Sequence, residues 1–238
     1  MSLRRPFFLL VLAALLPLVL LSALLGAAWI RDQQQVLERE ALATVDRVAA
    51  LIDRELVAQR DILRSLADAP IFDAPLDLAK VAEYAERLRD HQPLWRQIVV
   101  SDAGGNRLLS LPAQPGAPPN VIEPESHAVA VSTLRPVIGG IRRGVRNHPA
   151  FPVRVPVIRD GKLICVLTAA IEPETINQLL QGTGSAPEWI GAVVDGAGNL
   201  VGRTVDASER VGYPASADAL RVVRQRESGL YEGRVLEG

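Results

Sequence analysis

Two short stretches of the sequence share a pattern that predicts the fold class. Residues 98–106 read IVVSDAGGN, and residues 192–199 read AVVDGAGN. Each is an apolar, β-branched run that ends in Asp-x-x-Gly-Asn, and another apolar run follows it. The aspartate can cap a turn, and Gly and Asn readily adopt the left-handed backbone conformation that a tight hairpin needs. The recurrence predicts an α+β chain with two related modules, each built on an antiparallel sheet.

An apolar segment precedes both hairpins. Residues 6–30 carry no charge, and residues 7–30 are predicted to form a transmembrane helix, because about 20 apolar residues cross a bilayer core. By the positive-inside rule, Arg4 and Arg5 keep residues 1–6 in the cytoplasm, so the bulk of the chain is periplasmic and the inner membrane holds one span. A cleaved signal peptide is the alternative, with residues 26–28 (GAA) as the cleavage site. Its apolar region would exceed the usual length of about 7–15 residues.

Residues 31–69 are predicted to form one long stalk helix. Apolar side chains follow each other at alternating steps of three and four residues, with Gln59 as a polar exception, and charged residues flank them: Leu42, Val45, Ala49, Ile52, Leu56, Leu63 and Leu66. Pro70 ends the pattern. The stalk can pack against its own domain, and its membrane-proximal half can also pair with a second copy. We therefore expect a homodimer through this helix.

The remaining sequence alternates between helical and strand patterns. Asp160 and Gly161 join two strand-like runs at 153–159 and 163–171, which is a strong hairpin signal. Residues 112–124 are typical of a loop, and 127–150 indicate only short strands or turns around Gly139. Further helices are predicted at 76–90, 173–181 and 215–226, and further strands at 189–194, 200–204 and 229–236. The second module is thus predicted to be incomplete, which suggests a fragment of a longer protein or a truncated product.

The composition excludes several classes of function. A net charge of −1 argues against nucleic-acid binding. The single cysteine, Cys165, lies in an apolar run and is predicted to be buried. The histidines at 91, 127 and 148 lack metal-ligand spacing, and the sequence has neither a nucleophile elbow nor a phosphate-binding loop. We therefore predict no catalytic residues, no metal and no cofactor.

A cluster of positive charge is the strongest chemical signal. Between Arg135 and Lys162 the only acidic residue is Asp160, against seven cations: Arg135, Arg142, Arg143, Arg146, Arg154, Arg159 and Lys162. The planar guanidinium group suits carboxylates and phosphates. The hypothesis is that Arg135 or Arg142 enters a pocket and binds an anionic small molecule, with Trp95 and Tyr84 as walls. The alternative is a solvated basic face.

Several motifs resemble the double Cache sensor regions of bacterial transmembrane receptors such as sensor histidine kinases. They are residues 66–70 (LADAP), Trp95-x-x-Ile98 leading into Asp102-x-x-Gly105, residues 155–161 (VPVIRDG), Asp195-x-x-Gly198, and Gly229-x-Tyr231 with residues 236–238 (LEG). The resemblance implies two tandem PAS-like modules with antiparallel sheets. It places a membrane-distal, ligand-binding module at 70–172, a connecting helix and linker at 173–187, and a truncated membrane-proximal module at 188–238.

The same resemblance implies signalling through a second membrane helix to a cytoplasmic kinase, cyclase or chemotaxis output. The sequence contains neither that helix nor an output domain. An alternative function from another class is a membrane-anchored scaffold that dimerises through its stalk and binds a protein partner. An exported enzyme is a third class, for which the sequence offers no nucleophile, base or metal ligands.

Overall fold

The computed structural model describes residues 4–144, 147–182 and 189–225, in two compact units, Met1–Val45 and Asp46–Gly238. Helix α1 (Arg4–Ala67) contributes to both units, which confirms the predicted stalk helix. The apolar segment 7–30 is helical, but most of its side chains lie outside the described part of the chain. Among the residues that the structure describes, none of the helices combines the length and the apolar character that a membrane span requires.

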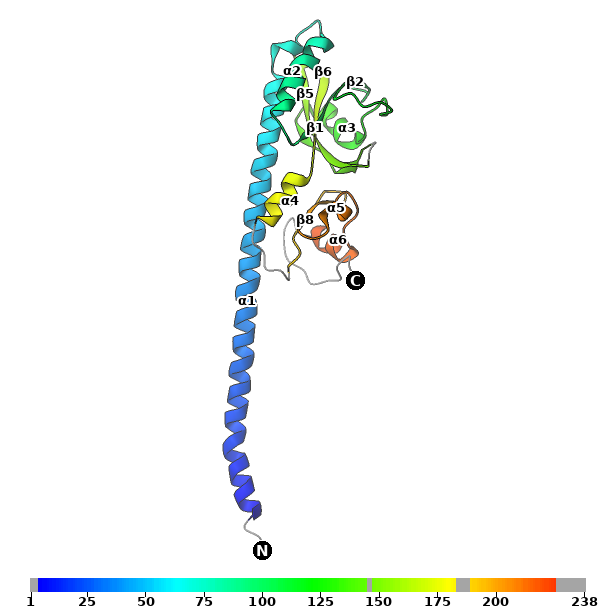
Figure 1. Cartoon of the computed structure of the whole chain (residues 1–238). Helices are drawn as coiled ribbons and strands as arrows, with labels where there is room; N and C mark the ends of the chain where they lie inside the picture. The colour runs from blue at the N-terminus through cyan, green and yellow to red at the C-terminus, as the bar shows by residue number, and fades with distance from the viewer. Residues whose placement is uncertain (1–3, 145–146, 183–188, 226–238) are drawn as a thin grey trace. The chain divides into compact units, whose positions relative to one another are not determined.

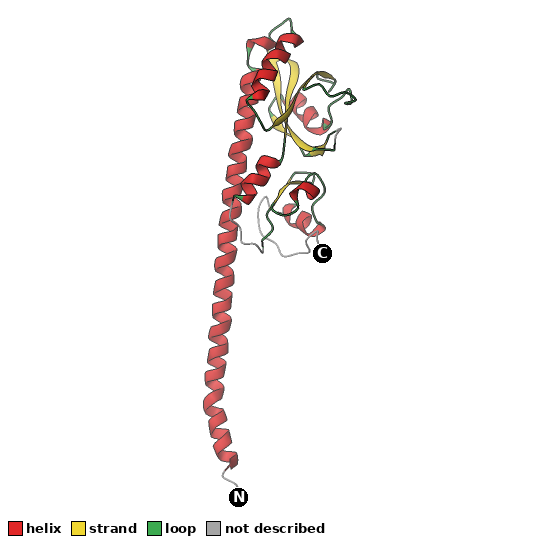
Figure 2. Ribbon diagram, viewed as in Figure 1, coloured by secondary structure: helices red, strands yellow, loops and turns green. Residues whose placement is uncertain are grey.

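A six-stranded antiparallel sheet is the centre of the second unit (Figure 2). Its strand order is β2-β1-β6-β5-β3, and β4 also pairs with β5. The bounds are β1 (Trp95–Ser101), β2 (Arg107–Leu111), β3 (Val137–Ile138), β4 (Arg142–Arg143), β5 (Pro149–Arg159) and β6 (Lys162–Ile171). The strands β1 and β2 form the first predicted hairpin, and β5 and β6 form the predicted Asp-Gly hairpin, in which Asp160 and Gly161 both have positive φ.

Strands β3 and β4 are two pieces of one edge strand. Both pair with β5, and Ile138 lies opposite Val153 while Arg142 lies opposite Ala150. The edge therefore advances four positions while β5 advances three, so the segment between the two pairs holds one extra residue. This is a β-bulge, which bends an edge strand and changes the direction of its groups. The bulge is formed by Gly139, Gly140 and Ile141.

The C-terminal part of α1 runs beside the sheet (Figure 1). The two share one apolar core. Val48, Ile52, Leu63 and Leu66 of α1 are buried in it, together with Val81 and Ala85 of α2 (Leu78–Asp90) and alternate residues of β1, β5 and β6. The predicted packing of the stalk against its own domain is confirmed for residues 48–67. Gln59 interrupts the apolar pattern because its Oε1 accepts a hydrogen bond of 2.5 Å from Trp95 Nε1 in this core.

The side chain of Arg159 stabilises the C-terminal end of α1. Arg159, at the end of β5, donates from Nη2 to the carbonyls of Ala67 (3.1 Å) and Ala69 (2.9 Å) and from Nε to Asp73 Oδ1 (2.6 Å). The last carbonyls of a helix have no partners within it. Arg159 supplies partners from the sheet. Residues Pro70–Phe72 then form the short 3-10 helix η1.

Helix α3 (Pro124–Thr133) differs from the prediction of short strands or turns over 127–150. Its sequence, PESHAVAVST, mixes β-branched residues with small ones, so its periodicity is weak. The start of the helix is nevertheless well defined, because Pro124 occupies its first turn and the Glu123 side chain accepts from Ser126 N at 3.1 Å. Local capping, rather than apolar periodicity, was the signal for this helix.

A smaller sheet follows the first one. Strands β7 (Ala192–Val194) and β8 (Leu200–Arg203) form the second predicted hairpin, and α4 (Glu174–Gln181), α5 (Ala207–Arg210) and α6 (Ala217–Val223) accompany it. The predicted helices at 173–181 and 215–226 are confirmed as α4 and the shorter α6. The backbone of Gly202 lies so close to α4 that an added Cβ would be 2.7 Å from Ile176. The predicted strand at 229–236 lies outside the described residues.

The bond between Trp95 and Gln59 provides a test of the core. We expect Trp95→Phe to lower the free energy of unfolding by about 1–3 kcal/mol, because it leaves the buried Gln59 Oε1 without a donor. Urea denaturation followed by circular dichroism measures this difference. The double variant Trp95→Phe/Gln59→Leu should recover part of the loss by removing the orphaned acceptor. A double variant that is less stable than the sum of both single variants would contradict this explanation.

Candidate functional site

A cavity of about 90 Å³ lies on the sheet in the second unit. Among the strand residues that line it, Gln97, Val99, Pro152, Arg154, Thr168 and Ala170 belong to the three central strands β1, β5 and β6. Their neighbours along each strand, such as Ile98, Val153 and Leu167, belong to the apolar core. Since side chains alternate between the faces of a strand, the cavity is on the face opposite the core. The 112–123 loop and the β4–β5 connection supply further lining residues, including Val121 and His148.

Charged side chains dominate the polar part of the lining. Arg96, Arg107, Arg142 and Arg154 line the cavity, against the single carboxylate of Glu123 among the described lining residues. The four guanidinium groups differ in how far their charge is compensated. Arg96 Nη1 is 2.7 Å from Glu172 Oε1 and is thus paired. The other three have distinct environments that determine what the cavity can bind.

Arg154 and Glu123 form a buried pair in the cavity wall. Their side chains are 3% and 6% exposed, and Arg154 Nη2 lies 3.4 Å from Glu123 Oε2 and 2.6 Å from the Glu123 carbonyl oxygen. Arg154 also donates to Ser126 Oγ (2.7 Å) and Thr168 Oγ1 (3.0 Å), and Ser126 Oγ bonds the Glu123 carboxylate in turn. Burial lowers the pKa of Arg154, while the Glu123 charge opposes this shift. The pair is largely satisfied without a ligand.

Arg107 and Arg142 are less compensated. Arg107, at the start of β2, donates to Gln97 Oε1 (3.2 Å) and to the Pro118 carbonyl (3.4 Å), and no carboxylate of the described residues lies within ion-pair distance of it. Burial lowers its pKa, although a guanidinium stays charged at neutral pH. Arg142 on β4 reaches Glu125 only at 3.8 Å, and that carboxylate is 67% exposed. These two groups can attract an anion.

The residues predicted from sequence as ligand contacts lie in different places. Of the four, only Arg142 lines the cavity. Trp95 is buried in the core beside α1, Tyr84 is 47% exposed on α2, and Arg135 is exposed after α3. The sequence analysis did not single out Arg107 or Glu123. Their positions in the sequence could have indicated them, since Arg107 directly follows the first hairpin turn and Glu123 caps α3. Contact of any of the four with a ligand stays a prediction.

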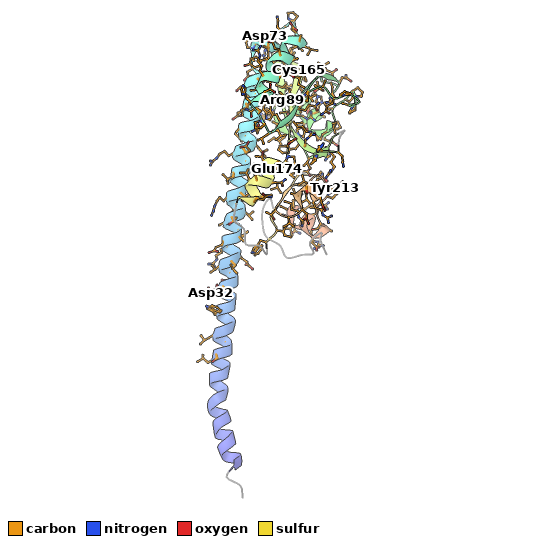
Figure 3. All side chains as sticks on the ribbon, viewed as in Figure 1. Asp32, Asp73, Arg89, Cys165, Glu174 and Tyr213 are labelled. Carbon is orange, nitrogen blue, oxygen red and sulfur yellow. The ribbon has the colours of Figure 1, made fainter. Side chains whose placement is uncertain are left out.

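The side chains of Cys165 and His127 are not among those that line the cavity. Cys165 on β6 is buried, as predicted, and desolvation raises the pKa of its thiol to about 12, so the thiol stays protonated (Figure 3). His127 on α3 is also buried, and desolvation followed by the charge of Arg154 lowers its pKa. Within the described ranges, no three His, Cys, Asp or Glu side chains gather in a way that could hold a metal ion.

Comparison with known proteins identifies this architecture. Neither a protein-family model nor a curated protein sequence matches the chain. Solved structures do match it. The ligand-binding domain of the Pseudomonas fluorescens chemoreceptor CtaA, in complex with L-isoleucine, superposes with a TM-score of 0.59 at 14% identity, over 76% of this chain and 74% of that one. The chain has the fold of a receptor sensor domain.

Two further structures agree. The ligand-binding domain of the Pseudomonas aeruginosa PAO1 amino acid chemoreceptor PctC, in complex with GABA, gives a TM-score of 0.56 at 18% identity, over 73% of this chain and 78% of that one. The sensor domain of the V. cholerae histidine kinase DctB gives a TM-score of 0.60 at 16% identity, over 81% of this chain and 77% of that one. The sequence motifs indicate a resemblance to receptor sensor regions, and these structures confirm it at the level of the fold.

The buried pair in the cavity wall can be tested by its stability. We expect Arg154→Met to cost about 3–5 kcal/mol of unfolding free energy, because it leaves the Glu123 carboxylate buried without its cation. The matched variant Arg96→Met removes a partly exposed pair on the same cavity and should cost about 1 kcal/mol or less. Chemical denaturation of both variants measures the difference. Equal losses would show that the Arg154–Glu123 pair contributes no more than a surface ion pair.

Proposed function

We propose that this chain is the extracytoplasmic, small-molecule-sensing region of a membrane-bound signal-transduction receptor. The observation that carries the proposal is a cavity with two weakly compensated guanidinium groups, Arg107 and Arg142, on the sheet of a sensor-domain fold. The ligand binds in the module at 70–172, which corresponds to the distal module of the resemblance. The chain itself has a binding role and not a catalytic one.

The ligand is a small organic anion. A carboxylate can accept paired hydrogen bonds from a guanidinium group, and such charge-assisted bonds are stronger than neutral ones. Two of the similar sensor domains are in complex with L-isoleucine and GABA, each of which carries a carboxylate. The apolar residues Val99, Val121 and Ile122 line the same cavity and suit the carbon part of such a molecule.

The membrane arrangement is part of the same proposal. Residues 7–30 anchor the chain in the inner membrane as a single span, with residues 1–6 in the cytoplasm and the rest in the periplasm. Supporting features are the uncharged sequence of this segment and the exposure of Leu21, Leu24, Leu25 and Trp29 on α1. A homodimer forms through the membrane-proximal half of the stalk at 31–69, where Leu37 and Leu42 are also exposed.

Calorimetry on the full chain in mild detergent tests the ligand site. The titrants are acetate, succinate, GABA and L-isoleucine. We expect at least one of them to bind, and Arg107→Gln and Arg142→Gln each to weaken that binding by about tenfold through loss of a charged hydrogen bond.

The matched control is Arg135→Gln, because Arg135 is exposed and lies outside the cavity lining. We expect this variant to bind as tightly as the unmodified chain. Equal affinity of all three variants would contradict the cavity as the binding site. If only Arg135→Gln lost affinity, the binding site would instead be the surface that follows α3.

A further inference from the structure

The bulged edge strand carries one arginine toward the cavity and the next one away from it. Arg142 and Arg143 are consecutive in β4, opposite Ala150 and Pro149 of β5. Side chains at consecutive strand positions point to opposite faces. Arg142 accordingly lines the cavity, while Arg143 does not. The same two-residue strand therefore has one side chain in the candidate ligand site and one available for a different contact.

Arg143 makes that contact with the second module. Its Nη2 donates to the Val211 carbonyl oxygen at 2.7 Å, and its Cζ lies 4.1 Å from the centre of the Tyr213 ring, which is labelled in Figure 3. Its Nη1 donates to the Asn147 carbonyl at 2.9 Å. Gly212, between the two contacted residues, has a φ of +87°, and an added Cβ would lie 3.2 Å from Arg143 Nε. The segment 211–213 is thus shaped closely around this guanidinium.

A second attachment lies one residue before Arg142. The bulge directs the Ile141 N–H away from β5, and it donates to Asp195 Oδ2 of the second hairpin turn at 3.0 Å. Asp195 Oδ1 meanwhile accepts from the backbone N–H groups of Ala197 (2.9 Å) and Asn199 (2.8 Å). Gly140 allows this approach, since an added Cβ would be 2.9 Å from Asp195 Oδ2. The turn that marks the second module is therefore also a contact to the first.

The two attachments flank the cavity residue on both sides. We propose that Asp195 and Tyr213 are positioning residues that hold Arg142 in the cavity wall, so that the 192–223 module controls the affinity of the anion site in the first module. The proposal rests on the proposed function for the identity of the ligand. By thermodynamic linkage, if the contacts at Asp195 and Tyr213 strengthen ligand binding at Arg142, then ligand binding strengthens those contacts by the same free energy. This gives ligand occupancy a physical route to the second module.

Asp102 provides a matched control. It caps the first hairpin turn as Asp195 caps the second, with Oδ1 accepting from Asn106 N at 2.8 Å and Oδ2 from Asn106 Nδ2 at 2.7 Å. Asn at either position would turn one accepting oxygen into a donating amide and damage the turn to a similar degree. Only Asp195→Asn would also place that amide against the Ile141 N–H. The two variants therefore separate turn stability from contact between the modules.

The test measures the position of Arg142 directly and needs no ligand. The full chain is treated with phenylglyoxal, which modifies accessible arginines, and the rate at each arginine is followed by peptide mass spectrometry. We expect Asp195→Asn and Tyr213→Leu to raise the rate at Arg142 by about threefold, since its side chain is 35% exposed in the fold and local opening exposes the remainder. Asp102→Asn should leave the Arg142 rate unchanged.

Arg154 serves as an internal monitor of general unfolding, because its side chain is only 3% exposed. A rise at Arg142 without a rise at Arg154 supports the positioning role. The proposal is overturned if Arg142 keeps its rate in both Asp195→Asn and Tyr213→Leu, if Arg154 rises in parallel, or if Asp102→Asn has the same effect. Since no anion is added, failure of this test leaves the calorimetric evidence for ligand binding intact, and absence of anion binding would not alter the modification rates.

Discussion

The antiparallel pairing of β5 with β6 separates the apolar core of the domain from its charged cavity. Val153, Val155 and Val157 lie in the core with α1, while Arg154, between two of them in sequence, lines the cavity with Thr168 of β6. A slip of one residue in this pairing would exchange the two faces. It would place a guanidinium in the core and valines in the cavity. The Asp-Gly turn between the strands and the extent of their pairing prevent that exchange.

Burial of polar groups is tolerated because their partners come from distant parts of the sequence. Gln59 of α1 accepts from Trp95 of β1, and Arg154 of β5 is surrounded by Glu123, Ser126 and Thr168. Each group would be costly if left alone. Because these buried groups already have partners, an incoming anion can bind only the weakly compensated charges of Arg107 and Arg142.

Much of the fold could be predicted because its signals are local. The hairpins, the β5–β6 pair, α1 and α2 each follow from apolar periodicity and turn residues within about 40 positions. Helix α3 was not predicted, because its start is marked by a capping residue and its interior contains β-branched residues. The site was harder to predict. Trp95 was predicted as an apolar pocket wall, yet it lies on the core face, and which face of the sheet forms the core depends on which helix covers it.

The sequence by itself determined the two hairpin modules, the long helix and the arginine-rich segment from which Arg142 comes, because periodicity, turn chemistry and charge act between neighbouring residues. Only the tertiary structure decided that Arg142 would share a cavity with Arg107 and Glu123, and that Asp195 would reach the backbone of Ile141. These contacts depend on strand order and on a one-residue bulge at the edge of the sheet. Strand pairing joins residues far apart in sequence, and no local pattern encodes which of them meet.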